Sequence, residues 1–318
     1  MLASEDDNAR DYAEAVRVVL GELPDLPHLP EVPGRGAGAG MTGRGVALLA
    51  GLAADLQPAG WRLTDAPGVD HRRARSLLAR DLDVIEEMTD GYVGPFKVQV
   101  IGPWTLAATV ELPRGDKVLA DHGARRDLAQ SLAEGVITHI EDVRRRLGGL
   151  TELIVQVDEP AINAVLDGKV PTASGFGRHR SVDRPELSDT LGWVLSAIRD
   201  AGAEPVVHCC ADDAPISLLR GAGAAGVAVD LGTLTAAGLD EFAEAVEAGD
   251  RVLLGAAPTT GAATTKQVAE SVARTFDILG IEPTSRLALT PACGLAGSAD
   301  VPDARQRLVA CREAAATL

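Results

Sequence analysis

The sequence predicts an α/β protein with the (β/α)8 architecture of a TIM barrel, and two observations lead to this prediction. Apolar, β-branched runs of four to six residues recur along the 318-residue chain, and amphipathic stretches such as residues 124–133 and 264–272 separate them. Strands that alternate with helices are typical of repeated βα units in a parallel sheet. No glycine-rich phosphate-binding loop follows any of these runs, which argues against a doubly wound open sheet.

Seven such runs are present, one fewer than a complete eight-stranded barrel requires. They cover residues 61–64, 96–101, 153–157, 205–209, 226–229, 252–255 and 286–290. Before them, residues 3–20 are predicted to form an acidic helix, and residues 23–40 are too rich in proline and glycine to be helical, so we expect a long ordered loop. The first barrel strand is therefore expected to be lost or altered, or to lie upstream of Met1 in the native chain.

Length and composition favour one domain, residues 1–318, with a small-molecule partner. The chain has 46% hydrophobic residues and no obvious linker, and its net charge of −16 argues against nucleic-acid and anionic-membrane partners. The N-terminus is acidic, and no apolar run reaches the roughly 18 residues of a membrane span. Four cysteines, two of them adjacent, do not form a disulfide framework, so we expect a cytoplasmic location.

Polar and titratable residues follow the predicted strands, where a TIM barrel carries its active site. These residues are Asp65, Asp158, Glu159, His208, Cys210, Asp230 and Cys293. The carboxylates are ambiguous when each is considered by itself. Asp158-Glu159 fits a glycosidase pair or a plain surface pair, and the plain interpretation is favoured. Asp65 and Asp230 each precede a turn, so a capping role is about as well supported as a binding role.

His208 and Cys210 carry the clearest chemical signal, because side chains two residues apart on a strand lie on the same side and reach one ion. Taken alone, a His-x-Cys pair is more often a core histidine beside buried cysteines. Cys293, in the sequence Pro-Ala-Cys-Gly-Leu, supplies a candidate third ligand. Three protein ligands with an open fourth position are typical of a catalytic zinc site, whereas structural sites usually close with four.

Three segments together resemble the zinc-dependent, cobalamin-independent methionine synthases, specifically their C-terminal catalytic barrel. They are residues 155–161 (Val-Gln-Val-Asp-Glu-Pro-Ala), residues 208–210 (His-Cys-Cys) and residues 291–295 (Pro-Ala-Cys-Gly-Leu). The resemblance covers most of the chain and implies a Zn²⁺ cofactor held by His208, Cys210 and Cys293. Asp230 would take the place of the family's additional glutamate ligand.

The resemblance also implies a reaction, in which the thiol of homocysteine binds zinc and receives a methyl group to give methionine. Coordination deprotonates a thiol that is otherwise mostly protonated at neutral pH, so it activates the nucleophile. By the same resemblance Asp158 holds the substrate ammonium, Glu159 supports Asp158, and Asp65 contacts the amino acid. No further catalytic group is assigned beyond the zinc-activated thiol.

Two departures from the family are evident, and the second leaves the methyl donor open. A Gly-Ser strand end that helps to bind the amino acid is missing, and residues 257–261 (Ala-Pro-Thr-Thr-Gly) replace an Asp-x-His-Ser motif whose histidine is thought to protonate the departing folate. The donor is therefore either methyl-tetrahydrofolate or methylcobalamin on a corrinoid protein. Three alternatives also remain: a corrinoid-to-thiol methyltransferase of coenzyme M type, a metal-free decarboxylase relative, and a degenerate barrel that binds without turnover.

Overall fold

The computed structural model describes residues 5–261 and 263–318, which form the following helices and strands. The helices are α1 (Glu5–Glu22), α2 (Met41–Leu48), α3 (Val69–Met88), α4 (Pro103–Thr109), α5 (His122–Arg146), α6 (Ile162–Leu166), α7 (Arg184–Asp200), α8 (Ile216–Gly221), α9 (Ala236–Glu247), α10 (Thr265–Leu279) and α11 (Val301–Ala315). The strands are β1 (Ala53–Gln57), β2 (Gly60–Thr64), β3 (Gly94–Ile101), β4 (Leu150–Asp158), β5 (Glu204–Cys209), β6 (Gly226–Asp230), β7 (Arg251–Ala257) and β8 (Leu287–Pro291).

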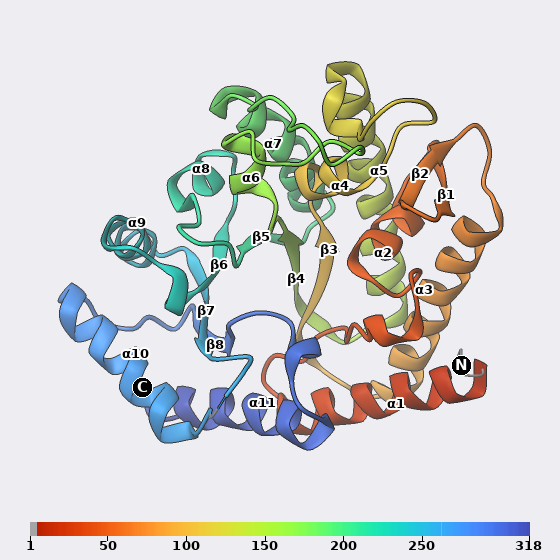
Figure 1. Cartoon of the computed structure of the whole chain (residues 1–318). Coiled ribbons are helices and arrows are strands. Elements are labelled where there is room, and N and C mark those ends of the chain that lie inside the picture. The colour runs from red at the N-terminus through yellow and green to blue at the C-terminus, as the bar shows by residue number, and fades with distance from the viewer. Residues whose placement is uncertain (1–4, 262) are drawn as a thin grey trace.

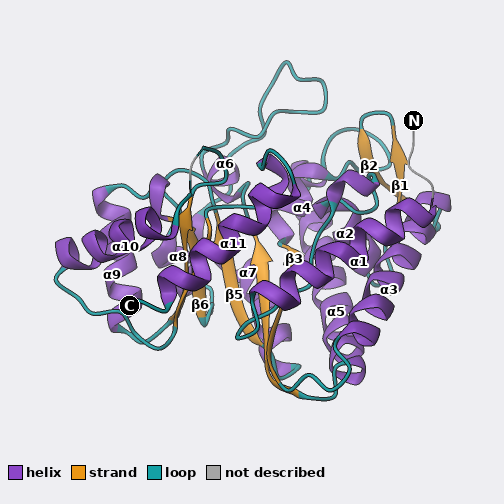
Figure 2. Cartoon of the chain, turned by 90° about the horizontal axis from the view of Figure 1, so that it is seen from below, coloured by secondary structure: helices purple, strands orange, loops and turns teal. Residues whose placement is uncertain are grey.

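Six of the seven predicted strands form one parallel sheet in the order β3-β4-β5-β6-β7-β8. Figure 1 shows this sheet curled into a half-barrel with helices around its outer side, and Figure 2 shows β3 and β5 pointing the same way. The register aligns Ile101 with Asp158 and Asp158 with His208. The prediction of a parallel α/β sheet is therefore confirmed, whereas the described residues form six strands of this sheet rather than eight.

The predicted strand at residues 61–64 is a strand but does not belong to the half-barrel. It lies within β2, which pairs antiparallel with β1 in a separate two-stranded sheet. A tight turn joins the two strands, and Gly60 at this turn has a φ of +132°, a conformation that glycine adopts at low cost. A four-residue apolar run does not specify its pairing partner, which is why the parallel assignment was wrong.

Residues 27–29, expected to be part of a loop, occupy the place of a strand beside β3. His28 forms a parallel bridge with Lys97. The Leu29 N–H donates to the Lys97 carbonyl over 2.9 Å, and the Lys97 N–H donates to the Pro27 carbonyl over 3.0 Å. Pro27 and Pro30 have no N–H to donate, so the pairing is limited to this bridge. A short paired segment rather than a full strand therefore borders β3. The predicted N-terminal helix is observed as α1, and residues 3 and 4 of that prediction lie outside the described part.

Two hydrophobic clusters position the sheet. The larger one fills the space between strands and helices and extends from Tyr12 in α1 to Ala314 in α11. The smaller one lies on the inner face of the half-barrel, where Leu26 and Ala288 pack against Ile154, Val206, Ala228 and Leu253. Side chains alternate along each strand, so the residues two positions further toward the carboxyl ends lie on the same inner face. These residues are available to form a polar site. Within the described part of the chain, no helix is both long and apolar enough to cross a membrane.

Candidate metal centre

Three predicted zinc ligands converge at the carboxyl end of the sheet. His208 lies near the end of β5, Cys210 follows that strand directly, and Cys293 lies two residues after β8. One ligand atom from each residue lies within 4.8 Å of the other two. Segments 83 residues apart in the sequence thus meet at a single point, because β5 and β8 curl toward each other in the half-barrel.

The geometry of these side chains fits a tetrahedral zinc ion. The Sγ atoms of Cys210 and Cys293 are 3.4 Å apart, and both cysteines are free thiols. Zinc–sulfur bonds of about 2.3 Å in tetrahedral geometry place two sulfurs roughly 3.8 Å apart, whereas a disulfide requires about 2.05 Å. The observed separation is therefore close to that of a shared metal ion. A His-Cys-Cys donor set is also the soft set that zinc prefers.

A backbone contact orients the imidazole of His208. Its Nδ1 lies 3.0 Å from the Ala228 carbonyl oxygen on β6, so Nδ1 carries the proton that it donates to this carbonyl. Nε2 then keeps its lone pair for a metal ion. Metal-binding histidines are commonly held in this way by a carbonyl or carboxylate behind them.

The three side chains influence one another's protonation. The hydrogen bond between Cys293 and Cys210, followed by the hydrogen bond with His208, lowers the pKa of Cys293. The same contact with Cys293 and burial raise the pKa of Cys210. Burial by itself lowers the pKa of His208, but Cys293 and Asp158 outweigh burial and raise it overall. Cys293 is thus the thiol that ionises first, and a thiolate is the form that binds zinc.

Asp158 ends β4 beside His208 and is almost completely buried. Its Oδ1 accepts a hydrogen bond of 2.7 Å from the Gln156 side-chain amide. Burial raises the pKa of Asp158 to about 6, while His208 and the Gln156 amide act in the opposite direction. This is a carboxylate at the carboxyl end of the sheet with acceptor capacity left for a cationic group.

Glu159, the next residue, binds the start of α4. Its Oε1 accepts from the Trp104 N–H over 2.9 Å, and its Oε2 accepts from the N–H and the hydroxyl of Thr105 over 2.8 and 2.7 Å. The carboxylate thus binds the first turn of α4. A side chain at Gly102 would place a Cβ 2.2 Å from Glu159 Oε1, so this approach requires glycine. Glu159 thus connects β4 to α4, because both of its oxygens accept hydrogen bonds from the start of that helix.

Asp230 and Asp65 lie outside the three-residue cluster. Asp230 ends β6, and its carboxylate accepts a 2.8 Å hydrogen bond from the Gly232 N–H. Burial, followed by the Cys293 charge, raises its pKa, so it lies near the cluster without being one of the three converging groups. Asp65 is exposed after β2, on the two-stranded sheet, and Asp55 rather than Asp65 binds the first turn of α3. The structure does not bring Asp65 together with the other site residues.

A polar group inside the half-barrel was missed from the sequence. Lys97 donates to the side-chain oxygens of Gln99 and Gln156 over 3.3 and 3.2 Å, and Gln156 donates onward to Asp158. The signal was present in the β3 sequence Phe-Lys-Val-Gln-Val, in which polar residues alternate with apolar ones. Such alternation indicates that one face of the strand lies in a polar environment.

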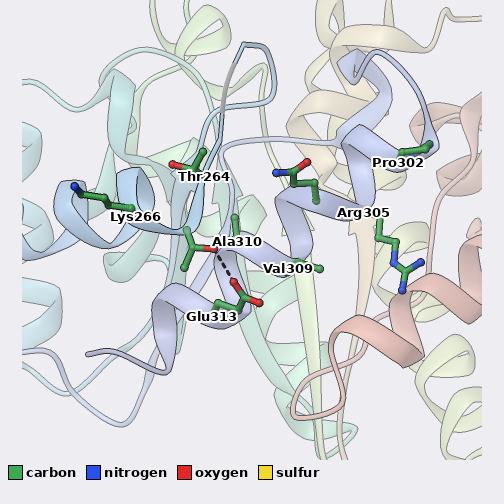
Figure 3. Close-up of a pocket in the computed structure, with 9 residues that line it drawn as sticks. Thr264, Lys266, Pro302, Arg305, Val309, Ala310 and Glu313 are labelled. Carbon is green, nitrogen blue, oxygen red and sulfur yellow. Dashed lines mark hydrogen bonds between the residues drawn. The ribbon is translucent and has the colours of Figure 1, made fainter.

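A cavity of about 490 Å³ lies away from the metal ligands, between the start of α10 and α11 (Figure 3). Its lining residues are Thr264, Thr265, Lys266, Pro302, Arg305, Gln306, Val309, Ala310 and Glu313. The Thr265 hydroxyl donates to Glu313 across it over 2.7 Å. None of the predicted site residues lines this cavity.

Comparison with solved structures finds a likeness in fold to a methionine synthase. A B12-independent methionine synthase from Shewanella sp. W3-18-1, in complex with selenomethionine, superimposes with a TM-score of 0.64 at 14% identity, covering 99% of this chain and 89% of that one. Two mandelate oxidase structures reach TM-scores of only 0.30 and 0.32 at 16% identity, with 98% of this chain covered and 93% and 94% of theirs. Scores this low carry no argument about the present chain. No curated protein matches the sequence.

The sequence itself matches the family described as "Cobalamin-independent synthase, Catalytic domain" over residues 84–317. This match spans strands β3 to β8 and therefore includes the three converging residues predicted to bind zinc, together with Asp158. It covers more than half of the chain, and the resemblance found in the short motifs is confirmed. The chain belongs to the family of cobalamin-independent methionine synthase catalytic domains.

Proposed function

We propose that the chain is a zinc-dependent methyltransferase that transfers a methyl group to the thiol of homocysteine and so forms methionine. The observation that carries this proposal is the convergence of His208, Cys210 and Cys293 within 4.8 Å of one another. Zinc bound there would lower the pKa of the substrate thiol and keep its sulfur nucleophilic. Asp230, half-buried beside the cluster, is our candidate for a fourth ligand that substrate displaces.

In this proposal Asp158 binds the α-ammonium group of homocysteine, and the Gln156 amide fixes the orientation of the carboxylate. Glu159 acts only by anchoring α4 to the end of β4. The whole chain forms one catalytic domain. We also propose a reducing, cytoplasmic setting, because thiols 3.4 Å apart would otherwise oxidise to a disulfide.

Family membership favours methyl-tetrahydrofolate over a corrinoid as the methyl donor. The loop after β7 nevertheless contains no titratable side chain between Pro258 and Gly261, so the departing folate nitrogen would take its proton from another source. A corrinoid leaving group needs no proton. Methyl-tetrahydrofolate and methylcobalamin are therefore the two donors to compare.

Zinc stoichiometry measured by elemental analysis tests the proposal first. We expect about one zinc per chain in the wild type and its loss in His208→Ala and Cys293→Ala. Cys209→Ala is a matched control, because Cys209 is buried in the hydrophobic core next to Cys210 and should leave the zinc content unchanged. A wild type that binds no zinc after reconstitution contradicts the proposal.

Methylation of homocysteine is then assayed with each donor on the zinc-loaded protein, with coenzyme M as a competing acceptor. Methionine formation supports the proposal, and its dependence on the donor identifies the methyl source. Methylation of coenzyme M without methylation of homocysteine would replace the proposed acceptor. Binding of zinc without turnover of either acceptor would indicate a non-catalytic member of the family.

A further inference from the structure

Lys97 lies inside the half-barrel, where a lysine is unusual. It is paired in register with Ile154 of β4, and its neighbours Phe96 and Val98 are completely buried in the larger core on the helix side of the sheet. Lys97 must therefore project from the opposite, inner face. A buried ammonium group costs free energy unless it is hydrogen-bonded and charge-compensated. The contacts of Lys97 should thus explain its presence.

Those contacts form a continuous series that ends at Asp158. Lys97 Nζ donates to Gln156 Oε1 over 3.2 Å, and Gln156 Nε2 donates to Asp158 Oδ1 over 2.7 Å. Lys97 Nζ also donates to Gln99 Oε1 over 3.3 Å, and Gln99 Nε2 donates to the Leu29 carbonyl over 2.6 Å. The series connects the short paired segment at residues 27–29 to the Asp158 carboxylate beside His208.

The donor and acceptor capacities in this series permit a single orientation of the Gln156 amide. An ammonium group only donates hydrogen bonds, and an ionised carboxylate only accepts them. Lys97 therefore faces the amide oxygen, and the amide NH₂ is left to face Asp158. Without Lys97, the Gln156 amide could rotate and direct its oxygen at the carboxylate, which is repulsive.

Charge supports the same arrangement. Burial lowers the pKa of Lys97, and Asp158 followed by Glu31 counteracts this. The Asp158 carboxylate thus stabilises the charged form of the Lys97 ammonium group at the other end of the hydrogen-bonded series.

We propose that Lys97 is a positioning residue for amino-acid recognition, which acts through the Gln156 amide to hold the Asp158 carboxylate toward the α-ammonium group of a thiol amino acid. This inference rests on the proposed function, because it takes Asp158 as the group that receives the ammonium of homocysteine. Lys97 does not touch the substrate. Its contribution is the orientation of the Asp158 carboxylate through the Gln156 amide.

Binding of two thiols to the zinc-loaded protein, measured by titration calorimetry, tests this role. Homocysteine carries the ammonium group and 4-mercaptobutyrate lacks it. The ratio of their Kd values therefore measures how much the contact between the ammonium group and Asp158 contributes to binding. In Lys97→Met we expect the Kd of homocysteine to rise about tenfold, with little change for 4-mercaptobutyrate. Lysine acting only as a structural group would shift both Kd values together, and that result would overturn the proposal.

A double-mutant cycle tests whether Lys97 acts through Gln156. We expect Gln156→Leu to raise the Kd of homocysteine to a similar extent, and the double variant to lose no more than either single variant. Full additivity would show that Lys97 acts by another route. If Lys97→Met fails to fold, Gln156→Leu alone must still reduce the preference for homocysteine over 4-mercaptobutyrate, and an unchanged preference overturns the proposal.

Controls separate this inference from the proposed function. Lys169→Met makes the same substitution at an exposed position, where Lys169 pairs only with Asp167, and should leave both Kd values unchanged. Zinc content should equal that of the wild type in all these variants. Normal homocysteine binding by wild type with no effect of Lys97→Met would overturn the inference alone. A wild type that does not bind homocysteine would overturn both.

Discussion

Adjacent carboxylates at the end of β4 illustrate how single residues acquire different roles. Asp158 and Glu159 are equivalent in the sequence, and both are buried. Glu159 accepts three hydrogen bonds from the start of α4, whereas Asp158 accepts one from Gln156. Side chains that alternate along a strand and then enter a turn point to different places. One carboxylate therefore stabilises the fold, and the other is left for a ligand.

Conservative amide substitutions should separate these roles. Glu159→Gln places an NH₂ group against backbone donors, so we expect the free energy of unfolding to fall by about 1–3 kcal/mol. Asp158→Asn should change it by less than about 1 kcal/mol, because removing a buried charge offsets the lost charged hydrogen bond, yet should weaken homocysteine binding at least about tenfold. Urea denaturation and titration calorimetry measure the two effects. The opposite pattern would reverse the roles assigned to this pair.

Close packing between α2 and α5 depends on one glycine in the longer helix. A Cβ at Gly135 would lie 1.7 Å from the Leu48 carbonyl oxygen, which is backbone and cannot move aside without shifting α2. We expect Gly135→Ala to lower the free energy of unfolding by about 3 kcal/mol or more, as overpacking of a core does. Gly21→Ala is the control, since nothing lies within 4 Å of its Cβ in α1 and alanine favours helix. This control should stabilise by up to about 1 kcal/mol, and equal effects in urea denaturation would contradict the packing argument.

The elements that could be predicted from the sequence are those whose pattern is local. The six strands β3 to β8 are apolar runs followed by helices. His208, Cys210 and Cys293 were predicted because they lie in distinctive short motifs at the ends of β5 and β8. The β1–β2 hairpin was not predicted, since a run at residues 61–64 does not encode its partner. The pairing of residues 27–29 was not predicted either, because prolines on both sides argue against a strand unless a neighbouring edge is already in place.

Stability of the whole molecule should fall as the solution becomes acidic, and His139 contributes to this fall. His139 is buried in α5, and burial, followed by the charge of Arg44, lowers its pKa to about 4 from its usual 6.5. The unfolded chain therefore binds a proton first as the pH falls below 6.5, and stability is lost between pH 6.5 and about 4. We expect the wild type to lose about 2 kcal/mol more than His139→Leu between pH 6.5 and 5. Identical pH slopes in urea denaturation would show that His139 does not contribute.

The N-terminal helix α1 packs against the C-terminal helix α11. Figure 1 shows α11 and α1 along the lower edge of the molecule, meeting near their ends. Glu22 at the end of α1 joins the two helices by ion pairs with Arg305 over 2.5 Å and Arg312 over 2.9 Å. The Glu22 side chain is 8% exposed, although Arg305 remains 61% exposed. Arg312 also donates to the Glu22 carbonyl. Because α11 also packs against β8, this cluster fixes the N-terminal helix to the strand that precedes the Cys293 loop.

Glu22→Gln should therefore weaken the attachment of α1 to the rest of the fold. We expect a loss of about 1–2 kcal/mol in the free energy of unfolding, together with faster hydrogen exchange confined to α1 amides. Glu14→Gln is the matched control, because the Glu14–Arg17 pair is exposed on α1 and should contribute less than about 0.5 kcal/mol. If the two variants exchange and unfold alike, the hydrophobic contacts of Tyr12 and Val16 hold α1 in place without help from the buried carboxylate.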